Sequence, residues 1–210
     1  MKLSDWRLEY TIVILVVFAV VLMFIPTSIK STVQANFISK WKDNYSKLEY
    51  AQDAILKQGQ VKILPGFNNC KTPEECEKFF IILIKPYIRI NDTKFPKHYH
   101  AKYMNNSKIP NDSPYYVHDY FYTNNKVIVG IKDLPDERNG RTKFLMTFDV
   151  NGIIPPNRWG RDVFGVIVYP DKIEAIGADL PLDMQKDSCS LNSTGVACSN
   201  YYLIGGGFDD

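Results

Sequence analysis

The amino-acid sequence predicts an α+β fold in which a long N-terminal helix packs on an antiparallel β-sheet. Apolar residues recur at helical spacing before Gly59, and β-prone runs separated by turn residues follow between Tyr115 and Gly177. Helices that precede strands along the chain favour an α+β arrangement. With 45% hydrophobic and 23% charged residues among 210, the composition is globular and excludes wholesale disorder. The net charge of +2 gives no reason to expect a nucleic-acid partner.

The N-terminal part of the chain is strongly apolar. Thr11–Ile25 carries no charge, and the uncharged stretch continues to Ile29. A helix that rises about 1.5 Å per residue can just cross a hydrocarbon core of about 30 Å over this length. We therefore predict that residues 1–30 form a cytoplasmic tail and the transmembrane half of the first helix. A cleaved signal peptide is the alternative, although no A-x-A-like cleavage site follows the run.

The helical pattern continues beyond the apolar run with one apolar stripe. Its members step by three and four residues, and only Gln52 interrupts it: Ile29, Val33, Phe37, Trp41, Tyr45, Leu48, Gln52 and Ile55. We expect one helix of about 50 residues, kinked at Pro26, whose second half lies on the sheet. Residues 31–210 are then an extracytoplasmic head that includes this amphipathic half.

Further elements follow in the head. A capping box at Thr72–Glu75 predicts a second helix that ends near Pro86. We interpret the polar residues 91–114 as a long loop. The strands of one antiparallel meander are expected next, at residues 115–123, 126–131, 142–150, 163–169 and 172–177, with a last strand-like run at residues 200–204.

The four cysteines form two pairs that are local in sequence, Cys70 with Cys76 and Cys189 with Cys198. Their spacings match no common zinc site, so we predict two disulfides, with free thiols as the alternative. Disulfides persist in oxidising compartments. The cysteines therefore place the head outside the cytoplasm and the N-terminus inside it.

Two sets of residues resemble the type IV pilins and the type II secretion pseudopilins. Arg7-Leu8-Glu9 runs into the apolar segment, and Pro26 follows at the separation found in that family. Residues 148–164, FDVNGIIPPNRWGRDVF, are similar to the D-x-N-G…P-N-x-x-G-x-D-x-F segment of pilin-like proteins. Cys198 and the two tyrosines after it resemble the C-terminal cysteine loop of the family. Together these features span nearly the whole chain.

The resemblance implies roles for two residues in filament assembly. The glutamate of the family, here Glu9, is thought to pair with the amino terminus of a neighbouring subunit, and Pro26 corresponds to the helix kink. A prepilin carries glycine, phenylalanine and threonine just before its apolar helix. The corresponding residues here are Ser4, Asp5 and Trp6, so the sequence departs from the family at the cleavage site.

Asp149, Asn151 and Asp162 are the candidate metal ligands, because they supply oxygen atoms around a glycine-containing loop. Calcium binds such loops, but Asp and Asn also form turns without a metal, and we expect the turn role here. No cofactor is expected.

The chain contains none of the common motifs for nucleophilic, zinc-dependent or nucleotide-dependent catalysis. We therefore expect no enzyme. The predicted function is that of a pilin-like subunit in the bacterial inner membrane, a single-pass protein with a periplasmic or extracellular head. Its expected partners are the membrane and other pilin-like subunits of a type IV pilus or type II secretion filament. The alternative is a non-polymerising bitopic membrane protein whose ectodomain binds a ligand or partner.

Overall fold

The computed structural model describes residues 3–57, 72–94, 99–134, 143–169 and 171–208. The chain divides into two units, Met1–Asn36 and Phe37–Asp210, and the second is called the head unit. The elements within the described residues are the helices α1 (Leu3–Lys57), α2 (Pro73–Ile88), α3 (Leu182–Ser188) and α4 (Cys198–Leu203), and the strands β1 (Ile90–Lys94), β2 (Asp119–Thr123), β3 (Ile128–Leu134), β4 (Lys143–Asp149), β5 (Val163–Val168) and β6 (Ile173–Ala175).

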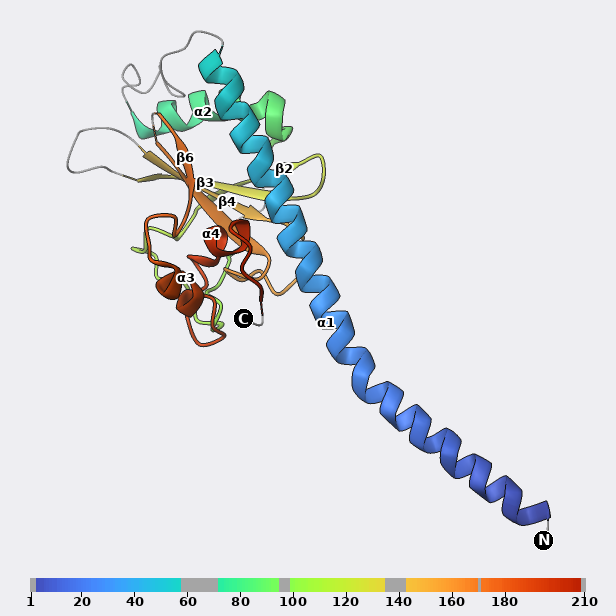
Figure 1. The fold of residues 1–210 in the computed structure, drawn as a ribbon. Coiled ribbons are helices and arrows are strands. Elements are labelled where there is room, and N and C mark those ends of the chain that lie inside the picture. Colours follow the sequence, from blue (N-terminus) through green and yellow to red (C-terminus); the bar gives the residue numbers. More distant parts are fainter. Residues whose placement is uncertain (1–2, 58–71, 95–98, 135–142, 170, 209–210) are drawn as a thin grey trace. The chain divides into compact units, whose positions relative to one another are not determined.

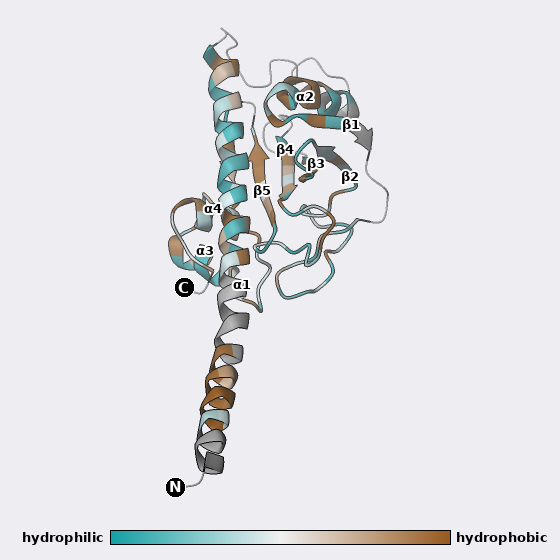
Figure 2. Ribbon diagram, turned by 90° about the vertical axis from the view of Figure 1, so that its right-hand side faces the viewer, coloured by the Kyte–Doolittle hydropathy of each residue, from teal (hydrophilic) through white to brown (hydrophobic). Residues whose placement is uncertain are grey.

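The first unit contains the N-terminal part of α1. Residues 10–21 of this helix are exposed and mostly apolar, and Figure 2 shows this stretch mainly in brown. Across the described ranges of the chain, no helix has the combination of length and apolar character that spanning a membrane requires.

The head unit contains a six-stranded sheet in the order β1-β2-β3-β4-β5-β6, and every neighbouring pair is antiparallel. This confirms the α+β class and the antiparallel meander. Helices cover one face of the sheet, since Trp41 and Leu48 of α1 and Phe80 of α2 share a core cluster with Phe144 of β4.

The central strands contribute to a core on each face of the sheet. Phe144, Met146 and Phe148 of β4 point towards the helices, whereas Leu145 points to the opposite face. This alternation is the two-residue period of a strand. On the opposite face, Leu145 packs in a second cluster with residues of the chain before β2, among them Tyr99. The sheet is therefore buried on both sides.

The second helix begins as predicted and runs slightly further. The backbone N–H of Glu75 donates to the Thr72 hydroxyl, and a proline occupies the first turn. The helix continues through Pro86 to Ile88. It ends where Arg89 adopts a left-handed conformation and its N–H bonds to the carbonyl oxygen of Lys85. Such a left-handed residue satisfies a carbonyl group that the helix itself leaves without a donor.

Two of the predicted segments differ from the structure. Residues 91–114 are not entirely a loop, because β1 occupies Ile90–Lys94 and pairs with β2 at the edge of the sheet. An edge strand has only one neighbour, so it tolerates the polar residues Asn, Asp and Thr that suggested a loop. The run at residues 200–204 is not a strand but mainly helix α4. The sequence also gave no sign of α3.

The reason for the error at α4 lies in its tertiary contacts. Tyr201 and Tyr202 favour strands by propensity, but both are buried, and strand geometry would direct consecutive side chains to opposite faces. Here both tyrosines belong to the same core cluster as Trp41. The Tyr202 hydroxyl also donates to the carbonyl oxygen of Gly160 at 3.1 Å. Packing therefore overrides local propensity.

Candidate functional site

The first candidate assembly surface is the apolar stretch of α1. Its large side chains are between 45% and 65% exposed, at almost every position from 10 to 21, and thus around the whole helix: Tyr10, Ile12, Val13, Ile14, Leu15, Val16, Val17, Phe18, Val20 and Val21. A helix that is apolar all round is typically buried in protein or lipid. Exposure of this amount of apolar surface marks a contact surface.

The part of α1 within the head unit is held on the sheet by its apolar stripe. Trp41, Leu48 and Ile55 are buried, and Phe37 and Tyr45 are partly buried against the same core. The stripe predicted from the sequence is therefore present from Phe37 onward. The indole ring of Trp41 stacks on Phe164 of β5 with 5.3 Å between the ring centres.

Three polar contacts fix the helix in register with distant segments. The Trp41 indole N–H donates to the carbonyl oxygen of Ser199 at 2.8 Å, and Lys40 Nζ donates to the carbonyl oxygen of Val150 at 3.4 Å. The backbone N–H of Ile173 donates to Gln52 Oε1 at 2.7 Å. Gln52 breaks the apolar stripe because its side chain pairs with the backbone at edge strand β6.

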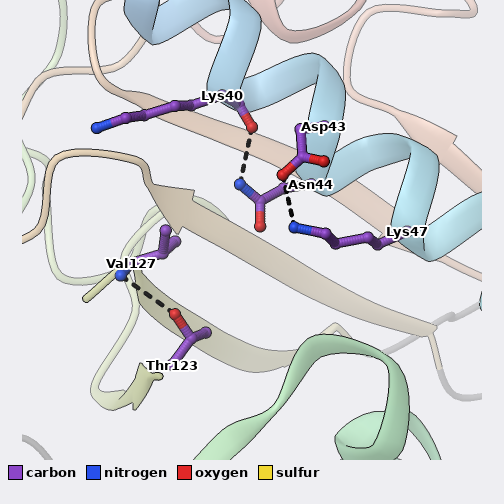
Figure 3. A network of polar contacts seen from close by, with 6 residues as sticks. All are labelled: Lys40, Asp43, Asn44, Lys47, Thr123 and Val127. Atoms are coloured by element: carbon purple, nitrogen blue, oxygen red, sulfur yellow. Dashed lines mark hydrogen bonds and ion pairs between the residues drawn. The ribbon is translucent and has the colours of Figure 1, made fainter. Parts of the chain in front are cut away.

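The same helix also carries two local polar contacts, one by the buried Asn44 and one by an ion pair. Figure 3 shows the Asn44 side-chain amide donating to the carbonyl oxygen of Lys40, and the ion pair between Asp43 and Lys47. These lie beside the turn between β2 and β3, where the N–H of Val127 donates to the Thr123 hydroxyl. Exposed ion pairs one turn apart contribute only a few tenths of a kcal/mol (about 0.3–0.5), so they add little to the free energy of unfolding.

The predicted disulfide between Cys189 and Cys198 is present, with 5.3 Å between the Cα atoms. It joins the end of α3 to the first residue of α4. Ser199 follows directly, and its hydroxyl accepts the N–H of Gly165 while its carbonyl accepts the Trp41 indole. The disulfide thus anchors the segment that receives α1. The other predicted pair lies outside the described residues, since Cys70 and the Cys76 side chain are not described.

The two residues with a predicted role in assembly also lie outside the side chains that the structure describes. Glu9 and Pro26 both lie within the bounds of α1, but their side chains are outside the described part of the chain. Their roles in filament assembly stay predictions.

The structure brings the predicted loop residues Asp149 and Asp162 together. Asp149 ends β4 and Asp162 immediately precedes β5, and both are buried. Asp162 accepts two backbone N–H groups, from Arg158 at 2.6 Å and Asn157 at 2.8 Å. Asp149 accepts the backbone N–H of Asn151 at 3.2 Å. These are the turn interactions expected from the sequence.

Two partners of this loop were missed by sequence reasoning. The Tyr99 hydroxyl, from the chain before β2, donates to Asp149. Asn157, with its amide nitrogen oriented towards acceptors, donates to the carbonyl oxygens of Gly152 and Ile154 and to Asp149. The Asn157 position was visible in the motif, but its bonds depend on the conformation of the loop. Nothing in the sequence linked Tyr99 to a residue 50 positions away.

Burial dominates the electrostatics of the pair. Burial raises the pKa of Asp162 to about 6, partly offset by the backbone N–H groups that stabilise the charged form. Burial also raises the pKa of Asp149, and the neighbouring Asp162 raises it further. The Tyr99 pKa is raised by burial and by the charge on Asp149. Two carboxyl groups so close together disfavour simultaneous ionisation.

Bound calcium in this loop stays the alternative hypothesis to the turn role expected from the sequence. Among the residues that the structure describes, no group of three or more His, Cys, Asp or Glu side chains is arranged to hold a metal ion. The candidate ligands predicted from the sequence in this loop are Asp149, Asn151 and Asp162. Both oxygens of Asp162 already accept backbone N–H groups. Calcium would have to share or displace these hydrogen bonds.

Comparison with known proteins adds no assignment. No family model matches the chain, and neither a curated protein nor a solved structure matches it.

Proposed function

We propose that this protein is a membrane-anchored, pilin-like subunit of a type IV pilus or type II secretion filament, and that it acts by assembly and not by catalysis. In the assembled state the apolar parts of neighbouring α1 helices pack together, and the head units cover them. Before assembly the same apolar stretch holds the subunit in the inner membrane. The N-terminus is then cytoplasmic and the head unit periplasmic or extracellular.

The observation that carries the proposal is the contrast between two parts of α1. Residues 10–21 expose large apolar side chains on every side, whereas residues from Phe37 onward present one apolar stripe to an antiparallel sheet. The first part needs an apolar environment that the described chain does not supply, and lipid or other helices of the same kind can supply it. The uncharged stretch Thr11–Ile29 has a helical length of about 28 Å, close to a hydrocarbon core.

The location outside the cytoplasm is supported by the Cys189–Cys198 disulfide. Disulfides that stabilise folded proteins form in the periplasm and on cell surfaces and are rare in the cytosol. Because this disulfide anchors the segment that accepts the Trp41 indole, an oxidising compartment favours the packing of α1 on the sheet.

A second candidate function is a non-polymerising bitopic protein whose head unit binds a ligand. It is favoured by a surface groove of about 750 Å³ beside the β2–β3 turn, whose lining includes Tyr122, Lys126 and Ile153. A groove of this size that combines apolar and polar side chains is suited to a small molecule or a peptide. The same exposed side chains are also available to a neighbouring subunit.

The two functions are separated by substituting Glu9. The full-length protein is expressed in its native membrane, and filament incorporation and crosslinked oligomers are measured for the parent, for Glu9→Gln and for Glu49→Gln. Glu49 is a matched control because it is an exposed glutamate on the same helix, within the head unit. A carboxylate among apolar helices is unfavourable unless a positive group pairs with it.

We expect Glu9→Gln to remain in the membrane fraction and to lose at least tenfold of the incorporated or crosslinked material. Glu49→Gln should behave as the parent. If Glu9→Gln assembles as well as the parent, Glu9 is an interfacial residue with no docking role. If the parent forms no oligomers at all, the non-polymerising alternative is correct.

A further inference from the structure

The region around α3 carries a cluster of exposed apolar side chains. Leu180, Leu182 and Met184 are 37%, 59% and 54% exposed, within five consecutive positions. Three exposed aspartates flank them, and we name the six residues together the α3 surface: Asp179, Leu180, Leu182, Asp183, Met184 and Asp187. Lys186 is the one basic residue among positions 179–188. The α3 surface is thus apolar at its centre and acidic at its rim.

A second exposed apolar cluster lies in the loop between β4 and β5. Ile153 and Ile154 are 58% and 64% exposed. They line the groove of about 750 Å³ together with Lys126, and none of the described residues that line it is acidic. Lys40 approaches the same loop through its bond to the carbonyl oxygen of Val150. We name these four residues, Lys40, Lys126, Ile153 and Ile154, the β4–β5 tip; it is apolar at its centre and basic at its rim.

The β4–β5 tip is held in place by the loop beneath it. Gly152 has a φ of +74°, and a Cβ atom there would lie 2.6 Å from the carbonyl oxygen of Lys126. On the other side, Asn157 donates to the carbonyl oxygens of Gly152 and Ile154. The loop is therefore ordered by its own hydrogen bonds and by its close contact with the β2–β3 turn. Binding through Ile153 and Ile154 then avoids the entropy cost of ordering a flexible segment.

We propose that the α3 surface of one copy binds the β4–β5 tip of the next copy. Both centres are apolar, and the aspartates of one rim face the lysines of the other, which fixes the register and disfavours contacts between like surfaces. Because the two surfaces differ, a pair of copies leaves one α3 surface and one β4–β5 tip unused, on opposite partners. A head-to-tail contact of this type extends into an open filament unless it closes into a ring.

This inference rests on the proposed filament function and adds a specific contact between head units. The contact involves few residues, so it is weak for an isolated pair. In a filament the apolar helices hold neighbouring heads close together, and a weak contact then forms at a high effective concentration. Its contribution is to set the direction and spacing of the heads.

The test uses two full-length variants with different tags, Met184→Cys and Ile153→Cys, expressed together in the native membrane and treated with a short bifunctional maleimide. Both positions are exposed, so neither substitution removes core packing. We expect at least tenfold more crosslinked product between the two variants than within either variant alone. Charge reversals test the rims of the contact. Lys126→Glu in the Ile153→Cys chain, or Asp183→Lys in the Met184→Cys chain, should each reduce the crosslinked product at least tenfold. The two reversals together, one in each chain, should restore it. Lys108→Glu in the Ile153→Cys chain alters an exposed lysine of another loop, so this matched control should leave the product unchanged.

Three outcomes overturn the contact. Product within one variant alone shows that like surfaces meet, and capture of a different protein by Ile153→Cys shows another partner for the tip. Absence of product between the two variants, in membranes where other crosslinks reveal oligomers sensitive to Glu9→Gln, rejects the contact while the filament function stands. Product that persists in Glu9→Gln supports the contact while the role of Glu9 in assembly fails.

Discussion

At the scale of single residues, Trp41 connects the first helix to the end of the chain. Its ring is fully buried against Phe148 and Phe164, and its N–H bonds to the carbonyl oxygen of Ser199. We expect Trp41→Ala to lower the free energy of unfolding by about 3–5 kcal/mol. Trp41→Phe should cost less, because it keeps part of the packing but leaves the Ser199 carbonyl without its donor, at about 1–3 kcal/mol.

Denaturant titration followed by circular dichroism measures both variants. Tyr50→Ala is the control, since Tyr50 lies on the same helix but is 69% exposed. It should stay within about 1 kcal/mol of the parent. A Trp41→Ala variant as stable as the parent would show that α1 does not depend on this anchor.

Asp162 gives the head unit a dependence on pH. Its pKa in the folded protein is about 6, whereas an unfolded aspartate has a pKa of about 3.9. Between these pH values the folded state keeps a proton that the unfolded state has released. The contribution of Asp162 to the free energy of unfolding therefore falls as the pH rises from about 4 to about 6, by roughly 3 kcal/mol in total.

Asp162→Asn removes this titration, so its stability should change less across that pH range than the stability of the parent. Thermal melts between pH 4 and pH 7 measure the difference. Asp171→Asn, which alters an exposed aspartate in the turn before β6, should keep the pH profile of the parent. An equal slope for the parent and Asp162→Asn contradicts the raised pKa.

At the scale of elements, the disulfide determines how the C-terminal segment meets the sheet. Cys189–Cys198 closes a short loop between α3 and α4, and such loops contribute about 2–3 kcal/mol by restricting the unfolded chain. The double variant Cys189→Ser/Cys198→Ser should therefore melt several degrees below the parent. Reduction of the parent should lower the melting temperature at least as far, because it also breaks the predicted Cys70–Cys76 disulfide, and reduction of the double variant should add only the contribution of that second disulfide.

The elements also show which features can be predicted from the sequence. The stripe from Phe37 to Ile55 was predicted because its burial follows the helical period directly, and β4 was predicted as a strand from its β-prone residues. By contrast, β1 was missed because an edge strand can be polar. α4 was assigned as a strand because the burial of Tyr201 and Tyr202 depends on distant partners.

Some residues of the candidate site could likewise be predicted from the sequence, and others could not. The carboxylates Asp149 and Asp162 stood out because their motif is continuous in sequence. Tyr99, which binds Asp149, had no such signal, because its contact spans 50 positions and forms only when the chain before β2 folds over the sheet. A continuous motif therefore reveals site residues that are neighbours in sequence, whereas contacts such as Tyr99–Asp149 depend on the topology of the fold.

At the scale of the whole molecule, the two units have different sources of stability. The core of the head unit is formed by residues from Phe37 onward, and the three polar contacts between α1 and the rest of that unit begin at Lys40. The exposed apolar side chains at residues 10–21 belong to the other unit. We therefore expect that residues 1–36, to which we assign the proposed assembly and membrane attachment, can be removed without unfolding the head.

Deleting residues 1–36 is the direct test of that division. The shortened chain should accumulate as a soluble monomer when exported to the periplasm, with the Cys189–Cys198 disulfide formed and a melting temperature within a few degrees of the full-length protein in detergent. Deleting residues 1–46 should fail to give a folded protein, because it also removes Trp41 and with it the bond to Ser199 and the stacking on Phe164.

Size-exclusion chromatography and near-ultraviolet circular dichroism distinguish the outcomes of the two deletions. A 1–36 deletion that aggregates would mean that the apolar helix is needed to fold the head, and a 1–46 deletion that folds would mean that the stripe beyond Tyr45 is sufficient. The expected result, a stable head from which the apolar helix has been removed, is what a subunit requires if it is to leave the bilayer for a filament without refolding.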